Sequence, residues 1–164
     1  MAKTQITTHS KYDGVIVSKF TMRKVRDDLK IHIDDITEHL VSQLSYIGEA
    51  AVKIARENGT YNDITGNLRS SIGYVVLVDG KQRSVGPKKQ YKGKKGAGAQ
   101  GPPAATALMN KLTSTFPYGV VLIVCAGMNY AAYVESVHKK DVLTSAELEA
   151  ERLLKSLLKG FTKD

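Results

Sequence analysis

The sequence has little cysteine: Cys125 is the only one among 164 residues. A single cysteine cannot form a disulfide within the chain, and metal sites that need several thiolates are excluded. Cys125 lies in the apolar run GVVLIVCAG. A catalytic thiolate needs an electropositive and partly exposed setting, so we expect a packed and unreactive thiol.

Long apolar runs are also missing. No stretch approaches the roughly 18–20 apolar residues that span a bilayer. The first residues, MAKTQITTHSKYDG, lack the apolar stretch of a secretory signal. We therefore expect no membrane contact and a cytoplasmic location at synthesis. With 42% hydrophobic residues the chain can bury a core. Its length fits one domain over residues 1–164, with a loose amino terminus at 1–13.

The signatures of most enzyme classes are absent. The sequence has neither a nucleotide-binding P-loop pattern nor the G-x-S-x-G pattern of a nucleophilic serine. His32 and His39 are seven residues apart, which is too wide for an H-x-x-x-H metal pair. We expect no enzyme, cofactor or metal site. A hydrolase using Cys125 and His138 remains an alternative that rests only on the presence of both residue types.

Negative charge is missing from one long segment. Residues 80–134 contain no carboxylate and eight of the 24 basic residues. The rest of the chain balances sixteen basic against sixteen acidic residues, so the whole net charge of +8 comes from this segment. Glycine, proline and lysine dominate residues 86–103, which predicts an exposed, mobile loop. Its lysines are Lys88, Lys89, Lys92, Lys94 and Lys95.

The clearest pattern is a helical one. Apolar residues recur every three or four positions over residues 24–58, and Asn58-Gly59 follows as a stop signal. The spacing predicts one long amphipathic helix with a single buried stripe. The stripe consists of Val25, Leu29, Ile33, Ile36, Leu40, Leu44, Ile47, Ala51 and Ile54.

Residues 70–79 are rich in β-branched and aromatic side chains and predict a strand. Asp79-Gly80 favours a hairpin turn, with residues 82–85 returning as a partner strand. The most hydrophobic run, residues 118–126, predicts a strand at the centre of the sheet. A further short strand is indicated at 14–20, and helical stretches at 104–115 and 130–137.

The carboxy-terminal segment predicts a helix that begins at Thr144. Thr144 and Glu147 have the spacing of a capping box, in which each side chain accepts a hydrogen bond from a free backbone donor. Gly160 provides the stop. The apolar face consists of Leu148, Leu153, Leu154, Leu157 and Leu158.

Two short motifs stand out beside these elements. Residues 64–72, ITGNLRSSI, fit the pattern T-G-x-L-R-x-S-I. Thr65 and Gly66 suit a turn, because glycine accepts a positive φ angle. Leu68 and Ile72 would bury against the long helix, and Ser71 completes the motif. Residues 129–135, NYAAYVE, fit the pattern Y-A-x-x-V-E.

The contacts of the charged and aromatic residues of the motifs each allow two interpretations. Arg69 can pair with a carboxylate, and Glu135 is the candidate partner, in the same chain or across a subunit boundary. The alternative is an exposed Arg69 without a fixed partner. Tyr130 and Tyr133 suit the boundary of a subunit interface, or packing at the edge of the core.

The two motifs, in this order, resemble the phage minor-tail-component or tail-completion family, to which the minor tail protein Z of lambdoid phages is related. The resemblance implies an α+β fold, with a long amino-terminal helix packed on an antiparallel sheet and a helix at the carboxy terminus. It also implies a non-enzymatic subunit of a homo-oligomeric ring at the head–tail junction. Other tail or neck proteins would be its partners, in the virion tail after assembly in the host cytoplasm.

The sequence departs from the family pattern in two places. Family members often have a glycine and then a proline-containing stretch after the glutamate of the second motif, where residues 136–140 here read SVHKK. The loop at 86–103 also looks longer than usual. These differences concern the position in the virion more than the fold.

The basic loop supports a second hypothesis. Seven cations within residues 81–95 can neutralise phosphates, which gives salt-dependent binding without sequence preference. In a ring, such loops could meet DNA in the lumen or an acidic protein neighbour. In a lone subunit they would make the chain a DNA-binding module.

Overall fold

The structure, a computed structural model, describes residues 21–161. The strand expected at 14–20 and the loose segment at 1–13 lie outside the described residues. The elements in chain order are α1 (Met22–Glu57), α2 (Asn67–Ser70), β1 (Ile72–Val78), β2 (Lys81–Val85), α3 (Gly101–Thr113), β3 (Val120–Ala126), α4 (Ala131–Ser136) and α5 (Thr144–Phe161).

The long helix expected at 24–58 is confirmed as α1. The chain divides within α1 into two compact units, residues 1–38 and 39–164. In the first unit, Leu29, Ile33 and Ile36 are 57%, 61% and 55% exposed. The expectation of one stripe buried along its whole length is therefore wrong for this half, because periodicity defines an apolar face but not what covers it.

The second unit contains a three-stranded antiparallel sheet in the order β2-β1-β3. Asp79 and Gly80 join β1 to β2 with φ angles of 48° and 72°. Two positive values are typical of the type I′ hairpin turn, whose twist matches that of the strands.

The central strand is β1, so the expectation that residues 118–126 lie at the centre is wrong. Among residues 21–161, β3 pairs only with β1 and so forms an edge of the described sheet. Its strong hydrophobicity follows from helices on both faces of the sheet: Val121 and Ile123 pack with α3, whereas Leu122 and Val124 pack into the larger core.

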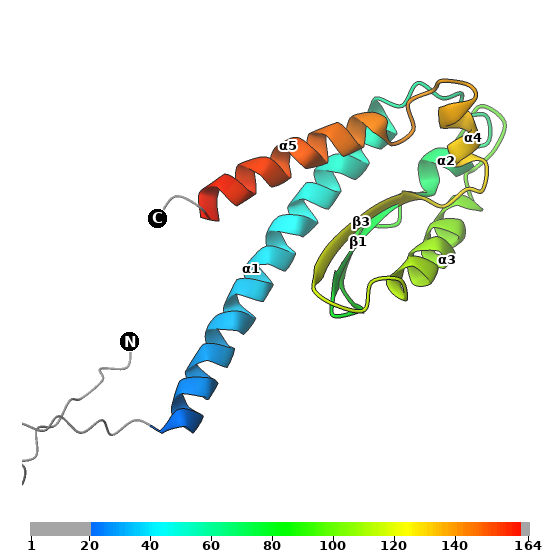
Figure 1. The fold of residues 1–164 in the computed structure, drawn as a ribbon. Coiled ribbons are helices and arrows are strands. Elements are labelled where there is room, and N and C mark those ends of the chain that lie inside the picture. Colours follow the sequence, from blue (N-terminus) through cyan, green and yellow to red (C-terminus); the bar gives the residue numbers. More distant parts are fainter. Residues whose placement is uncertain (1–20, 162–164) are drawn as a thin grey trace, which may run out of the picture. The chain divides into compact units, whose positions relative to one another are not determined.

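The larger core joins one face of the sheet to the second half of α1 and to α5 (Figure 1). Leu44, Ile47 and Ala51 of α1 are buried in this core, and Leu153, Leu154 and Leu157 of α5 pack against it. Val75 and Leu77 of β1 face the other way, toward Ala105 and Met109 of α3. The fold is thus α+β, as expected, with a long amino-terminal helix, an antiparallel sheet and a carboxy-terminal helix.

The loop expected at 86–103 ends earlier than its composition indicated. Gly101, Pro102 and Pro103 form the first turn of α3. Proline is accepted there because the first backbone N–H groups of a helix have no partner within the helix. No helix in the described part of the chain is long and apolar enough to cross a membrane.

Candidate assembly interface

The first motif forms the turn between α1 and the sheet. Gly66 has a φ angle of +78°, as expected, and Asn67 begins the short helix α2. Leu68 and Ile72 are 4% and 1% exposed, and both belong to the larger core. Ser71 is fully buried and ties the motif to the chain after β3, because its carbonyl accepts from Gly127 N at 2.9 Å.

The basic loop packs its backbone on this turn. Gly98 N donates to Thr65 O at 2.8 Å, and Lys95 N donates to Ile64 O at 2.7 Å. A Cβ atom on Gly66 would lie 2.0 Å from Tyr91 O, so only glycine permits this approach. The expectation of an exposed, mobile loop did not include this contact, for which the repeated glycines were the available signal.

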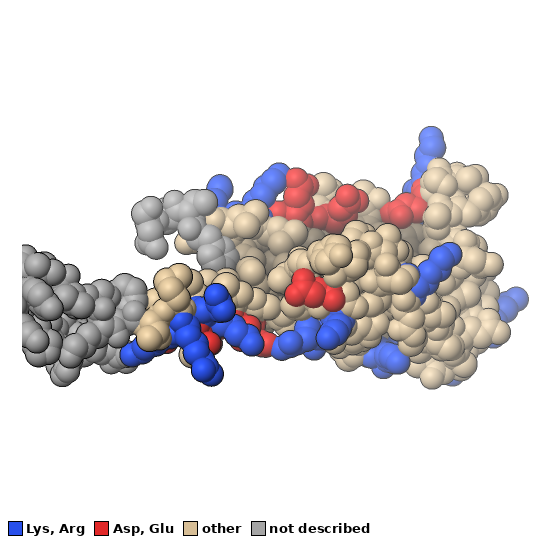
Figure 2. Space-filling view, turned by 60° about the horizontal axis from the view of Figure 1, so that its bottom comes forward, with Lys and Arg blue, Asp and Glu red and all other residues tan. Residues whose placement is uncertain are grey.

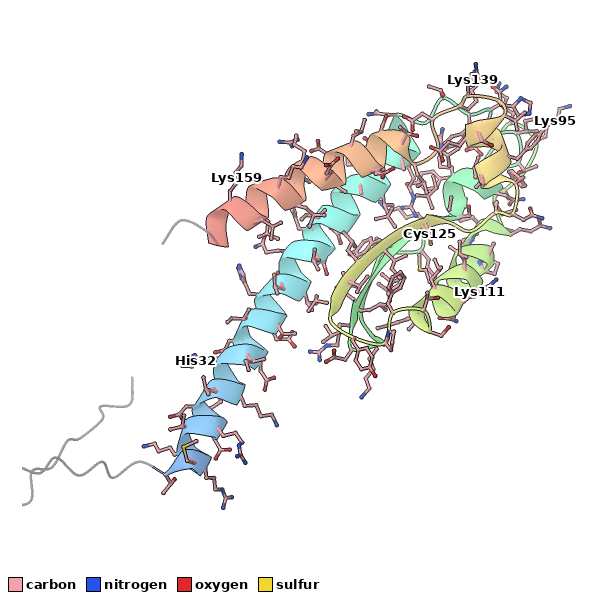
Figure 3. All side chains as sticks on the ribbon, in the orientation of Figure 1. His32, Lys95, Lys111, Cys125, Lys139 and Lys159 are labelled. Carbon is pink, nitrogen blue, oxygen red and sulfur yellow. The ribbon has the colours of Figure 1, made fainter. Side chains whose placement is uncertain are left out.

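The lysine side chains of the loop nevertheless face solvent. Figure 3 shows Lys95 pointing away from the body of the molecule. The exposed set consists of Lys88, Lys89, Lys92, Lys94 and Lys95. The loop therefore presents its positive charges from a backbone that is held in place.

Arg69 pairs with a different carboxylate from the one expected. Its Nε lies 3.3 Å from Oδ2 of Asp63, close enough for an ion pair but too poorly aligned for a hydrogen bond. The Arg69 guanidinium also lies over the rings of Tyr61 and Tyr91, at 6.0 and 5.9 Å from their centroids. The expected pair between Arg69 and Glu135 is wrong within one chain, because Asp63 lies beside Arg69 in the same turn.

Arg56 is a residue that the sequence analysis missed. It is 6% exposed near the end of α1, and its Nη2 donates to Ile72 O at 2.6 Å. Its guanidinium lies 5.3 Å from the centroid of the Tyr91 ring. Burial lowers the pKa of Arg56, and the nearby Tyr91 offsets part of that effect. Arg56 and Arg69 together hold Tyr91, which fastens the basic loop to the body.

Glu135 of the second motif caps the last helix. Its Oε1 accepts from the backbone N–H groups of Leu143 and Thr144, both at 2.9 Å, and from the Thr144 hydroxyl at 2.7 Å. Burial acts to raise the pKa of Glu135, but these hydrogen bonds outweigh it and leave the pKa below its usual value.

The expected capping box of Thr144 and Glu147 is therefore wrong. Thr144 lies inside the first turn, and its hydroxyl donates a hydrogen bond to Glu135. Asp141 supplies a second acceptor, for Ser145 N at 3.1 Å. Carboxylates from outside the helix satisfy the free backbone donors and also suit the positive end of the helix dipole.

The two motifs, some sixty residues apart in the sequence, line one groove of about 540 Å³, which we call the motif groove. Thr65 and Leu68 come from the first motif, and Tyr130 and Val134 from the second. Exposed apolar and aromatic residues on the same segments are Ile64 at 53%, Tyr130 at 37%, Tyr133 at 55% and Val137 at 57%. Tyr133 is braced by the ring of His138, edge to face at 5.2 Å.

The residues considered for chemistry lie in separate surroundings. Cys125 is 5% exposed and packs with α3, and burial raises the pKa of its thiol to about 11. His138 instead lines the motif groove. A thiol with so high a pKa stays protonated near neutral pH, as expected for a packed cysteine. Residues 21–161 contain no group of three side chains arranged to hold a metal ion.

Comparison of the chain with protein-family models, curated proteins and solved structures found no match.

Proposed function

We propose that this chain is a non-enzymatic assembly subunit of a phage tail, and that it acts in a ring at the head–tail junction. The observation that supports the proposal most is the motif groove. The two motifs that carry the family resemblance come from distant parts of the sequence and line the same surface. A surface that combines them is the expected place for the contact on which assembly depends.

The chemistry of the motif groove suits protein contact. Tyrosine offers a large apolar ring and a polar hydroxyl at a small loss of side-chain freedom, and it is enriched among residues that dominate interfaces. Tyr130 and Tyr133 are partly exposed on α4 and its approach. The scaffold beneath them is fixed by the hydrogen bonds of Glu135 and Ser71. Little ordering would therefore be required on binding.

The partner in this proposal is a neighbouring copy or another tail or neck protein. A ring needs a head-to-tail contact in which one surface meets a different surface of the next copy. The motif groove would be one side of that contact. The exposed lysines of the basic loop would then meet DNA in the lumen or an acidic neighbour.

The test is light scattering coupled to size exclusion on the full chain, alone and co-expressed with its candidate tail partners. We expect a discrete closed oligomer or a stable complex. Tyr130→Asp should prevent it, because Tyr130 lines the groove and a charge there would be buried at the contact. The matched control is Tyr118→Asp, at a tyrosine that is 83% exposed and does not line the groove. Equal behaviour of both variants and the parent chain would contradict the role of the groove.

A second candidate function is a DNA-binding module, favoured by the exposed lysines on an anchored backbone. On the face shown in Figure 2, however, basic side chains stand in small groups beside acidic ones rather than as one broad patch. The test replaces Lys88, Lys89, Lys92, Lys94 and Lys95 by Gln. Duplex DNA affinity should fall, together with its salt dependence. Unchanged binding would remove this candidate.

A further inference from the structure

A second concave surface lies between the end of α1 and the first part of the basic loop, and its lining residues differ from those of the motif groove. Its volume is about 850 Å³, within the roughly 300–1,000 Å³ that ligand sites occupy. The residues that line it all belong to the unit 39–164. We call this surface the arginine cleft. Its basic residues are Lys53, Arg56, Arg69 and Lys89.

Arg56 lines this cleft as a buried charge without a carboxylate partner. It is 6% exposed, and within residues 21–161 its Nε has no hydrogen-bond partner, while its Nη2 donates to Ile72 O. The ion pairs within the same residues do not include Arg56. The groups that offset the effect of burial on its pKa are Tyr91 and Tyr61 rather than carboxylates. Because arginine stays charged and a buried charge is costly unless it is paired, a negative group in the cleft would offset that cost.

Arg69 brings a second guanidinium to the same cleft. Its Nε also has no hydrogen-bond partner in the described part of the chain, because its ion pair with Asp63 at 3.3 Å is poorly aligned. The guanidiniums of Arg56 and Arg69 lie 5.3 and 5.9 Å from the centroid of the Tyr91 ring. Two planar cations therefore meet at one ring. A guanidinium presents parallel N–H donors, which match the two oxygens of a carboxylate.

The other charges of the lining distinguish one kind of anion from another. Lys53 and Lys89 are exposed and add positive charge, whereas the exposed Glu49 and Glu57 add negative charge. A chain of phosphates would carry several charges past both glutamates, and like charges repel. A single carboxylate would meet less of this repulsion. The lining thus favours a ligand with one negative group over a nucleic acid.

Aromatic rings complete the cleft. Tyr46 is 64% exposed, and the hydroxyl of Tyr74 donates to Oε1 of Glu49 at 3.3 Å. Tyr91 lines the cleft beside the two arginines. Tyrosine rings pack well against apolar side chains. A carboxylate carried between apolar side chains, as on a peptide, would use both the charges and the rings.

We propose that the arginine cleft binds an aspartate or glutamate side chain on a peptide segment of a protein partner. Arg56 and Arg69 supply the opposite charge at the centre of the cleft. Lys53 and Lys89 attract the carboxylate from the rim, and the tyrosines pack against its apolar neighbours. The site depends neither on the ring nor on the motif groove, so its test is separate from that of the proposed function.

The test is fluorescence anisotropy of a labelled peptide, Gly-Phe-Glu-Phe-Gly with blocked ends, titrated with the full chain. The matched probe has Gln in place of Glu. We expect the Glu peptide to bind about tenfold more tightly, because hydrogen bonds to an ionised group are about twice as strong as neutral ones. Equal affinities, or no binding of the Glu peptide at millimolar concentration, overturn the proposal.

Substitutions in the cleft locate the binding site. Arg69→Gln should weaken binding of the Glu peptide about tenfold and leave that of the Gln peptide within about twofold. Because Arg69 also pairs with Asp63, circular dichroism checks the fold of this variant. Lys89→Gln changes an exposed side chain and should weaken binding about two- to fivefold. The matched control is Lys111→Gln, which is exposed on α3 outside the cleft and should leave the affinity unchanged.

Two further outcomes would contradict the assignment. Equal weakening by Lys89→Gln and Lys111→Gln indicates attraction to the net charge of the chain and overturns the site. A duplex oligonucleotide that displaces the peptide from the parent chain, and that itself loses affinity in Arg69→Gln, assigns the cleft to phosphates and overturns the choice of a peptide. Tyr130→Asp should leave peptide binding unchanged, and loss of binding there would place the peptide in the motif groove instead.

Discussion

The two halves of α1 have the same apolar pattern and opposite surroundings. Ile47 and Ala51, in the second half, are 2% and 0% exposed, whereas Ile33 and Ile36, in the first, are more than half exposed. The second half is covered by the sheet and by α5. Periodicity therefore specifies which side of a helix is apolar, while the burial of that side depends on elements elsewhere in the chain.

The largest effect should come from truncating the buried half. Ile47→Ala removes a side chain from the larger core and leaves a cavity between α1 and the sheet. We expect a loss of about 2–5 kcal/mol in the free energy of unfolding, measured by urea denaturation monitored by circular dichroism. A loss below about 1 kcal/mol would mean that this half is not packed as the structure shows.

The next effect concerns Gly48, on the same buried side. A Cβ atom there would lie 2.5 Å from the ring of Tyr74, which is itself 2% exposed. Alanine improves helix propensity by about 1 kcal/mol, but overpacking a core typically costs about 1–3 kcal/mol. We therefore expect Gly48→Ala to lower the thermal midpoint of unfolding. A higher midpoint would show that Tyr74 moves aside freely.

A third change weakens the cap of α5, the helix that covers the buried second half of α1. Glu135→Gln keeps the shape of the side chain but removes the negative charge that accepts from Leu143 and Thr144. We expect a loss of about 0.5–2 kcal/mol near neutral pH, measured by thermal or urea unfolding.

The pH dependence of this change has a definite sign. The pKa of Glu135 is lower in the folded chain than its usual value of 4.5. Its contribution to stability is therefore complete above that value and is lost as the pH falls through the folded pKa. The difference between the parent chain and Glu135→Gln should shrink on acidification. A difference that stays constant would indicate that the charge of Glu135 does not stabilise the helix end.

The smallest effect should come from the exposed half. Ile36→Ala leaves no cavity, because the side chain is 55% exposed, so we expect a change within about 0.5 kcal/mol in dilute solution. A large loss of stability in dilute solution would show that the first half of α1 is covered within a single chain.

The sequence predicted those features that depend on local spacing. The extent of α1, the hairpin at Asp79-Gly80 and the positive φ angle of Gly66 all follow from residues next to one another in the chain. The position of each strand in the sheet, which depends on long-range pairing, was harder to predict. The hydrophobicity of residues 118–126 indicated a central strand, but an edge strand with helices on both faces needs the same composition.

The sequence predicted which residues belong to the candidate site better than it predicted which residues they contact. Gly66, Arg69, Glu135, Tyr130 and Tyr133 were all selected from the sequence. Their partners were not, because more than one carboxylate could reach Arg69 and more than one acceptor could cap α5. Arg56 gave no signal of its own, since an arginine near the end of a helix is ordinarily solvated.

By itself the sequence determined the α+β composition of elements, the amphipathic face of α1 and the segment that carries the excess charge. Those properties depend on residue order and on local backbone preferences. Only the tertiary structure decided that Glu135 caps α5, that Asp63 pairs with Arg69 and that the basic loop packs on the Gly66 turn. Such contacts join residues far apart in the chain or choose among equivalent partners, so packing geometry fixes them.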